Sequence, residues 1–280
     1  MVKKKYKHIA LFWVLIFSQW NFAQKENLPL IHSHNDYYQE TPFWKAYSCG
    51  LNSIEIDVFL KNDSLFVTHS ESEIIKNLDI ESLYLKPLQN VLELDYRSDL
   101  QLQLLVDIKS EAYSSLDQLT QILECYPKII YNQNIDIVIS GNRPQLEKYL
   151  DYPKHINFDY QSLKPIENPK IWDKISLISL SFKKVSNWNG KGRLINLDYQ
   201  KIKSIIHKAH SYNKPFRFWA TPDIKTAWKV FYDMGVDFIN TDLPCKASDY
   251  LSSFDQQVYK MEKKVSIYHP TYKHDQKKYQ

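Results

Sequence analysis

The sequence predicts an α/β fold in the form of an eight-stranded (β/α)8 barrel. Short apolar runs alternate with helical patterns along the whole chain, which is typical of parallel strands connected by helices. The length of 280 residues, less a leader of 24, suits one barrel-sized domain of roughly 250 residues. The chain has neither a Gly-x-Gly-x-x-Gly turn nor a P-loop, so nothing favours an open nucleotide-binding sheet.

The N-terminal segment predicts export. Residues 1–24 have the pattern of a signal peptide, with four lysines before position 8, the apolar run 9–17 and Ala23 at the expected cleavage point. The apolar run is shorter than the roughly 20 residues that a membrane span needs. We therefore expect a periplasmic or secreted protein without a stable membrane span after cleavage. Residues 25–263 would form the single barrel domain and residues 264–280 a polar tail.

The charge balance gives no support for nucleic-acid binding. The formal net charge is +4, and the leader carries four lysines and no acid, so the mature chain is close to neutral. The three cysteines, Cys49, Cys125 and Cys245, are dispersed and lack metal-ligand spacing. We expect buried free thiols, with one disulfide pair as the alternative. The oligomeric state is left open.

The apolar runs place the elements in order. The predicted strands are 28–33, 52–59, 64–68, 102–108, 135–140, 154–158, 175–181, 215–219 and 236–241. The predicted helices are 40–49, 115–125, 143–150, 197–212, 223–234 and 247–263. Gly50 and Gly235 each follow a helical pattern and precede a strand, so we expect left-handed residues that end helices.

Carboxylates interrupt two of the predicted strands. In "SIEIDVFL" Glu55 and Asp57 lie two residues apart and share one face of the strand. In "LQLLVDIKS" Asp107 and Lys109 do the same. Buried carboxylates need a positive partner, and a divalent cation with oxygen ligands suits three of them. Lys109 would neutralise the remaining charge or hold a phosphate.

Histidines stand close to these strands. The short turn "KNDS" predicts a hairpin that returns His69 to the end of the strand carrying Asp57. The first predicted strand ends in "IHSHNDYYQ", which contains His32 and His34. Histidine suits proton transfer because its ordinary pKa lies near neutral pH.

The ordered set "HSHND", "GLNSIEIDV", "LFVTH", "LLVDIKS", "FRFWATPD" and "GVDFINTDLP" resembles the phosphatidylinositol-phospholipase-C-like (PI-PLC-like) phosphodiesterases. That superfamily includes glycerophosphodiester phosphodiesterases and sphingomyelinase-D-type phospholipases, and the nearest branch is that of altered inheritance of mitochondria protein 6. The resemblance implies one Mg²⁺ or Ca²⁺ held by Glu55, Asp57 and Asp107. It also implies two catalytic histidines, His69 and either His34 or His32, of which we prefer His34.

The chain departs from the glycerophosphodiester enzymes at two points. It lacks their His-Arg-Gly and Glu-Asn-Thr motifs, and only 37 residues separate His69 from Asp107. The short separation is similar to the sphingomyelinase-D layout, so glycerophosphodiesters are not established as the natural substrate.

The resemblance implies a phosphoric diester hydrolase that acts on a phospholipid-derived or glycerol-type diester, by direct hydrolysis or through a cyclic phosphate. The expected catalytic residues are His34, His69 and Lys109. Substrate contacts are expected from Trp219, Arg217 and Asn35. His32, Asn240 and Asp242 are expected to contact the catalytic and metal-binding residues rather than the substrate.

Two other interpretations remain. A His-x-His pair at the end of the first strand is also typical of two-zinc amidohydrolase barrels, which use further histidines on later strands and an aspartate on the last. In this chain Asp242 would fit the aspartate, but His155, His207 and His210 do not lie at predicted strand ends. The second interpretation is a non-catalytic barrel that binds lipid or carbohydrate, for which the 20 tyrosines would provide an adhesive surface.

Overall fold

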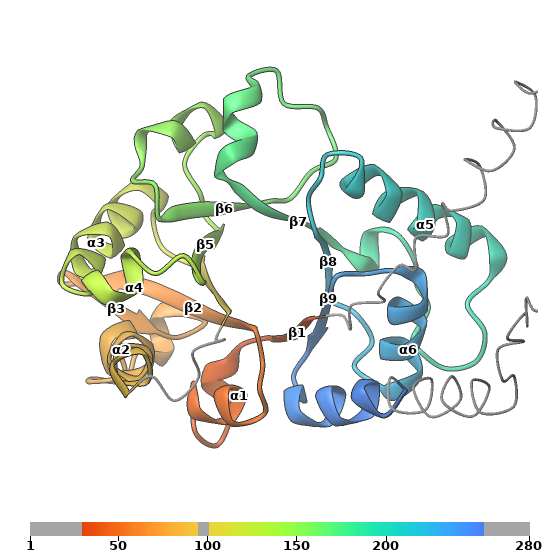
Figure 1. The fold of residues 1–280 in the computed structure, drawn as a ribbon, viewed down its shortest axis with the longest axis horizontal. Helices are drawn as coiled ribbons and strands as arrows, with labels where there is room; N and C mark the ends of the chain where they lie inside the picture. The colour runs from red at the N-terminus through yellow and green to blue at the C-terminus, as the bar shows by residue number, and fades with distance from the viewer. Residues whose placement is uncertain (1–29, 95–100, 255–280) are drawn as a thin grey trace, which may run out of the picture.

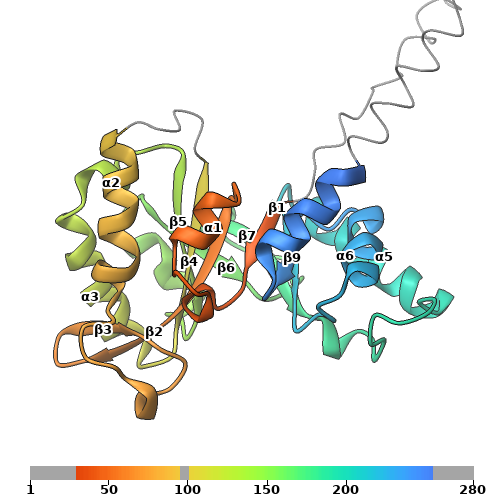
Figure 2. The same ribbon diagram turned by 90° about the horizontal axis from the view of Figure 1, so that it is seen from below.

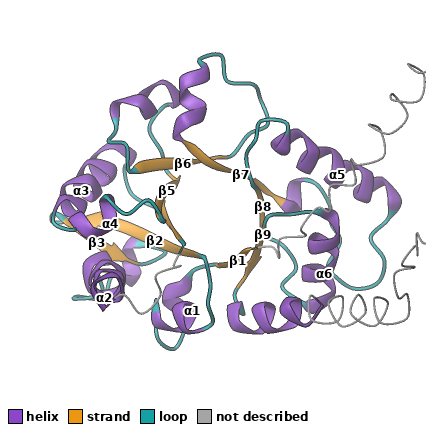
Figure 3. Ribbon diagram, viewed as in Figure 1, coloured by secondary structure: helices purple, strands orange, loops and turns teal. Residues whose placement is uncertain are grey.

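A computed structural model describes residues 30–94 and 101–254 as a closed barrel of parallel strands surrounded by helices (Figures 1 and 3). The strand order is β1-β9-β8-β7-β6-β5-β4-β2, and pairing between β1 and β2 closes the ring. The short β3 pairs antiparallel with β2 outside the ring. The predicted (β/α)8 barrel is thus confirmed. The expected signal peptide and the polar tail lie outside the described residues.

All nine predicted strands are present, and each of their boundaries lies within two residues of the predicted position. They are β1 Leu30–Ser33, β2 Ser53–Lys61, β3 Ser64–Val67, β4 Leu102–Ile108, β5 Ile135–Gly141, β6 Ile156–Tyr160, β7 Ile175–Ser181, β8 Phe216–Trp219 and β9 Phe238–Thr241. Strand β6 begins two residues later than predicted because a turn that ends with the Ile156 N–H donating to the Pro153 carbonyl precedes it.

The helices differ more from the prediction. They are α1 Trp44–Ser48, α2 Lys86–Leu94, α3 Ala112–Glu124, α4 Pro127–Ile130, α5 Asn196–His210 and α6 Lys225–Met234, and a further helix occupies residues 244–254. The predicted helix at 143–150 is instead the 3-10 segment Leu146–Asp151, and the prediction lacked α2 and α4. Pro87 is the second residue of α2 and follows the π-helical segment Glu81–Leu85, so helical backbone continues on both sides of the proline.

The two faces of the strands have different surroundings. Ile54, Ile56 and Val58 of β2 point outward and are completely buried under the helices. A separate apolar layer fills the inside of the barrel and consists of Leu105, Val138, Leu177 and Phe238. Two residues beyond Leu105 on the same face, Asp107 begins a polar layer. The apolar layer therefore closes the barrel below and leaves polar side chains at its C-terminal end.

A disulfide joins the first and last units of the barrel. Cys49 follows α1, Cys245 lies in the helix after β9, and the two Cα atoms are 5.4 Å apart. Cys125 is free and exposed. The expectation of buried free thiols is therefore wrong at all three positions. The partners are 196 residues apart in sequence, so only the closure of the barrel brings them together.

The two glycines have the expected backbone. Gly50 has a φ of 73° just after α1, and Gly235 has a φ of 83° at the end of α6.

In the described parts of the chain, no helix has the length and apolar character required to cross a membrane.

Candidate active site

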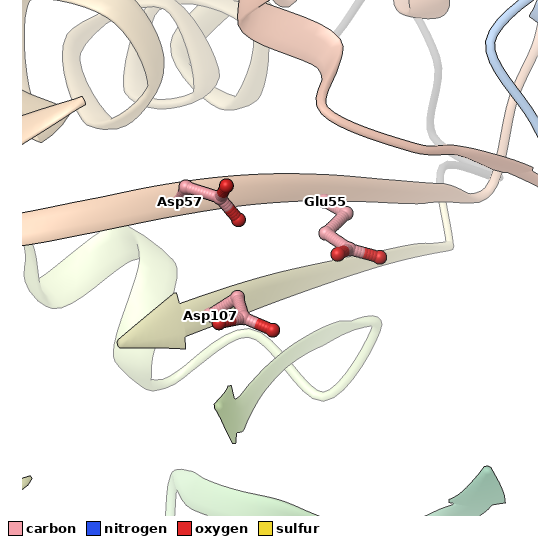
Figure 4. A group of neighbouring side chains, drawn as sticks. All are labelled: Glu55, Asp57 and Asp107. Atoms are coloured by element: carbon pink, nitrogen blue, oxygen red, sulfur yellow. The ribbon is translucent and has the colours of Figure 1, made fainter. Parts of the chain in front are cut away.

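Three carboxylates converge inside the C-terminal half of the barrel (Figure 4). Glu55 and Asp57 lie on β2, and Asp107 lies on β4 opposite Asp57 in the strand register. Each offers an oxygen within 4.8 Å of the others. Asp57 is fully buried and Glu55 nearly so, because alternation along β2 turns both toward the barrel interior.

This group has the donor chemistry that a hard divalent cation requires. Asp57 Oδ1 and Asp107 Oδ1 are buried and accept no hydrogen bond from the described residues, although Lys109 Nζ lies 3.2 and 2.9 Å from them. Burial and the charge of Glu55 raise the pKa of Asp107 to about 6, against the effect of Lys109. The protein thus does not fully compensate the third buried negative charge, and a bound cation would supply the missing positive charge.

Gly141 makes the space that the Asp107 carboxylate occupies. A Cβ atom at Gly141 would lie 2.2 Å from Asp107 Oδ1 and 2.5 Å from the Ile108 carbonyl oxygen. Gly141 also has a left-handed φ of 66° at the end of β5. A side chain at this position would displace a predicted ligand. Gly141 was not among the predicted site residues.

Glu55 is fixed by two residues deeper in the barrel. His32 Nε2 lies 2.6 Å from Glu55 Oε2, and the Arg217 guanidinium donates to the same oxygen. Burial opposes ionisation of Glu55, but Arg217 and the hydrogen bond from His32 outweigh burial and hold its pKa well below the usual range. Glu55 is therefore an anion with one oxygen fully engaged.

His32 is held by a hydrogen-bond chain. Its Nδ1 lies 2.6 Å from Ser53 Oγ, which accepts a hydrogen bond from Gln103 Nε2 at 2.7 Å. His32 Nε2 also contacts the Arg217 guanidinium, but Arg217 donates to Glu55 directly. We therefore assign the proton to Nε2, facing the Glu55 carboxylate, and Ser53 then donates to Nδ1. Burial, followed by the charge of Arg217, lowers the pKa of His32 to about 4. His32 thus contacts the predicted metal ligand Glu55 and is not part of the cavity lining.

His69 is attached to Asp57. Its Nδ1 lies 2.7 Å from Asp57 Oδ2, which also accepts a hydrogen bond from the Tyr37 hydroxyl at 2.9 Å. The hairpin predicted from "KNDS" is present, with Val58 opposite Val67. Donation from Nδ1 leaves Nε2 of the neutral ring as a proton acceptor on a half-exposed side chain.

His34 has the same arrangement with another carboxylate. Its Nδ1 lies 2.7 Å from Asp242 Oδ1, beyond the end of β9. Burial lowers the pKa of His34, but the hydrogen bond with Asp242 and the charge of Glu55 outweigh burial and raise it. His34 lines the cavity above the carboxylates, whereas His32 is completely buried. This geometry favours His34 over His32 as the proton-transfer residue.

The cavity above the carboxylates has a volume of about 420 Å³. Its lining includes His34, Glu55, Asp107, Lys109, Gln161 and Trp219. The Trp219 indole N–H is buried and has no hydrogen-bond partner among the described residues. Burial lowers the pKa of Lys109, but the charges of Asp107 and Asp57 outweigh it and raise the pKa, so Lys109 stays a cation.

The other predicted site residues have different positions. Arg217 reaches the cavity but ion-pairs with Glu55, and its Nη2 lies 3.7 Å from Asp159. Asn240 accepts a hydrogen bond from Arg217 at 3.3 Å. Asn35 has a left-handed φ of 46° before the short helix that follows β1 and is not part of the cavity lining. The substrate contacts of Arg217 and Asn35 stay predictions.

A buried polar group beneath the cavity was also absent from the prediction. Asp159 is fully buried and accepts hydrogen bonds from Ser140 Oγ at 3.0 Å and Ser179 Oγ at 2.7 Å. An aspartate within the apolar run "INFDY" was the available signal.

The histidines of the two-zinc interpretation lie elsewhere. His155 precedes β6 at the opposite end of the barrel, and His207 and His210 belong to α5. His210 binds Asp237 at 2.7 Å, ahead of β9. Within residues 30–94 and 101–254, only the group Glu55, Asp57 and Asp107 brings three potential metal-binding side chains this close together. The structure therefore does not support a histidine-rich zinc site.

Comparison with known proteins shows which families two segments of this chain resemble. The profile of the AIM6-like phosphodiesterase domain matches residues 24–101, which contain Glu55, Asp57 and the histidines. The profile of the glycerophosphoryl diester phosphodiesterase family matches residues 215–244, which contain Trp219 and Asp242. The two profiles and the relatives below support a relationship of this chain to the PI-PLC-like phosphodiesterase superfamily.

Individual members of the superfamily resemble the chain along most of its length. Altered inheritance of mitochondria protein 6 of Kluyveromyces lactis is 28% identical over 296 residues, covering 77% of this chain and 70% of the relative. A crystal structure of a glycerophosphodiester phosphodiesterase from Parabacteroides distasonis has a TM-score of 0.53 at 17% identity, covering 81% of this chain and 98% of that one. A calcium-dependent phosphoinositol-specific phospholipase C from Pseudomonas has a TM-score of 0.52 at 12% identity, covering 79% and 90%.

Proposed function

We propose that this chain is an exported phosphoric diester hydrolase that uses one divalent cation, Mg²⁺ or Ca²⁺, and two histidines. The observation that carries the proposal is the pairing of His34 with Asp242 and of His69 with Asp57 through Nδ1, next to the three carboxylates. Two histidines fixed in this way leave two Nε2 atoms for proton transfer at one site. The relationship to the PI-PLC-like superfamily supports the same reaction class.

The roles of the residues follow from these contacts. Glu55, Asp57 and Asp107 would hold the cation, which when bound supplies Lewis-acid polarisation of a phosphate oxygen. One of His34 and His69 would accept the proton of the attacking oxygen, and the other would donate a proton to the leaving group. The attacking oxygen belongs to water or to a hydroxyl of the substrate, and the second case gives a cyclic phosphate.

The charges suit an anionic diester. Glu55, Asp57 and Asp107 contribute three negative charges, and Arg217 and Lys109 contribute two positive ones. A divalent cation changes this balance from −1 to +1, and a phosphodiester of charge −1 then neutralises it. The Trp219 and Lys109 side chains line the cavity, and the Lys109 ammonium would donate hydrogen bonds to the diester. We infer a phospholipid-derived or glycerol-type substrate.

Export is part of the proposal. The lysine-rich start and the apolar run of residues 1–24 have the pattern of a signal peptide. The disulfide between Cys49 and Cys245 supports an oxidising compartment, since such bonds rarely persist in the cytosol.

The test is turnover of bis-(p-nitrophenyl) phosphate, followed by a panel of lysophospholipids and glycerophosphodiesters, with EDTA, Mg²⁺, Ca²⁺, Mn²⁺ or Zn²⁺. We expect activity with Mg²⁺ or Ca²⁺, and losses of at least roughly a hundredfold in His34→Ala and His69→Ala. His207→Ala on α5 is the matched control and should keep full activity. Phosphorus NMR of the products separates hydrolysis from cyclisation.

The outcomes are distinct. No turnover with any cation or diester would refute the enzymatic proposal and favour a binding barrel. Activity with Zn²⁺ alone would refute the assignment of a hard cation. Equal losses in His207→Ala and His69→Ala would show that histidine removal acts through stability rather than proton transfer.

A further inference from the structure

One exposed segment next to the site combines cations with apolar side chains. The β7–α5 loop, defined here as residues 183–199 and so including the first turn of α5, contains four basic residues, Lys183, Lys184, Lys191 and Arg193, and one acid, Asp198. All four cations are exposed, and none of them forms an ion pair within the described residues. Asp198 accepts a hydrogen bond from Ser186 Oγ at 2.5 Å. The loop therefore presents a local positive charge.

The same loop exposes large apolar side chains. Ile195 is 61% exposed, Leu197 is 76% exposed and Tyr199 is 38% exposed. Ile195 also lines a hollow of about 440 Å³ together with Lys183, Lys184 and Trp188, so the cations and the apolar groups are contiguous. Aliphatic side chains this exposed gain free energy when another apolar phase covers them.

The loop lies at the end of the barrel that contains the candidate active site. It begins just after Ser181 ends β7, and the cavity lies beyond the corresponding ends of β4, β5 and β8. In Figure 2 the loop projects from the same end of the barrel as the β2–β3 hairpin. A surface that bound the loop would thus face the entrance of the cavity.

We propose that the β7–α5 loop docks this protein on an anionic lipid surface. Exposed aliphatic and aromatic side chains flanked by lysine and arginine are the combination that inserts shallowly into a lipid interface, while the cations contact anionic head groups. The mature chain is close to neutral overall, so attraction to an anionic surface would come from this local cluster.

Charge argues against two other occupants. The C-terminal segment of this chain, "TYKHDQKKYQ", is itself rich in lysine and would be repelled by the loop. A second copy that docked through the same loop would bring four further cations against the first four. An anionic lipid surface satisfies both the charge and the exposed aliphatic groups. The inference does not depend on the proposed enzymatic activity, because binding is measured without turnover.

The test is co-sedimentation of the intact mature protein with vesicles of pure phosphatidylcholine and with vesicles containing 30% phosphatidylglycerol. We expect binding to the anionic vesicles that weakens as salt is raised. Replacing Lys183 and Lys184 by alanine should weaken partitioning roughly 25-fold, at about fivefold for each lysine. Replacing Ile195 and Leu197 by serine should weaken it at least about tenfold.

Matched controls lie at the opposite end of the barrel. Tyr131→Ser removes an apolar side chain that is 80% exposed ahead of β5, and Lys170→Ala removes an exposed cation ahead of β7. Both should partition like the wild type. Equal binding to neutral and anionic vesicles, unchanged partitioning of both loop variants, or equal losses in the controls would each overturn the proposal. Binding to a soluble acidic peptide but not to vesicles would overturn it as well.

Discussion

Gly141→Ala tests whether the end of β5 sets the position of a metal ligand. The new Cβ atom would lie 2.2 Å from Asp107 Oδ1, 2.9 Å from Asp107 Cγ and 2.5 Å from the Ile108 carbonyl oxygen. The carboxylate can rotate, but the carbonyl oxygen belongs to β4 and accepts a hydrogen bond from the Asn142 N–H at 2.8 Å. The substitution must therefore both displace the ligand and separate the two strand ends.

The chain offers a matched control for the backbone strain. Gly192 has the same φ of 66°, and a Cβ atom there would meet no atom within 4 Å. Both alanine variants pay about 1–2 kcal/mol for the left-handed conformation. Only Gly141→Ala adds the cost of overpacking, about 1–3 kcal/mol, and for a barrel of this size each kcal/mol lowers Tm by about 2–4 °C. Displacement of Asp107 should also weaken cation affinity roughly 10- to 100-fold.

The assay combines thermal melts with isothermal titration of Mg²⁺ and Ca²⁺ into the wild type and both variants. We expect Gly192→Ala to bind cations like the wild type and Gly141→Ala to bind them at least roughly tenfold more weakly. Equal cation affinities in the two variants would refute the claim that Gly141 creates the space for a metal ligand.

Three further predictions follow from other contacts. The disulfide from Cys49 closes a loop of 196 residues, for which the loss of loop entropy in the unfolded chain gives about 5 kcal/mol. Cys49→Ser should therefore lower the free energy of unfolding by about 2–5 kcal/mol in urea melts. An unchanged urea midpoint would contradict this prediction. Burial raises the pKa of Asp107 from 3.8 to about 6, so the folded state binds the Asp107 proton more tightly than the unfolded state does. The folding stability that this tighter binding contributes is complete below pH 4 and is lost as the pH rises through 6. Without divalent cations Asp107→Asn should therefore be more stable than the wild type at pH 8, by at most about 3 kcal/mol, with the difference absent near pH 3; an equal difference at both pH values would contradict the burial argument. Nitrogen-15 shifts of His32 should show the neutral Nε2–H tautomer at pH 7 and a weaker preference for it in Ser53→Ala, whereas an Nδ1–H tautomer in the wild type would disprove the hydrogen-bond chain.

The strands could be predicted from the sequence because each is an apolar run with few exceptions. The exceptions themselves indicated the candidate site: Glu55, Asp57 and Asp107 interrupt runs that are otherwise buried on both faces, and the structure brings the three carboxylates together. The helices were harder, since several have only four or five residues and cannot show a full amphipathic period. The 3-10 segment Leu146–Asp151 is an example in which a helical pattern did not give an α-helix.

What the sequence could not show depends on contacts between distant segments. The role of Gly141 depends on the Asp107 side chain of the neighbouring strand, 34 residues earlier in the chain. The hydroxyl of Tyr37 reaches Asp57 only because β1 lies beside β2. The pairing of Cys49 with Cys245 likewise requires the closed ring, and neither cysteine has a local pattern that indicates a partner.

Closure through β1 and β9 has a consequence for synthesis. Strand β1 forms four pairs, from Leu30–Phe238 to Ser33–Thr241, with β9, the last strand of the described residues, and only two pairs with β2. A nascent chain that ends before residue 241 therefore has two open sheet edges, at β1 and at the newest strand, and its polar interior is unsealed. The ring can form only after β9 has left the ribosome. Closure of the barrel should thus be a late step in folding, because the β1–β9 pairs join residues more than 200 positions apart.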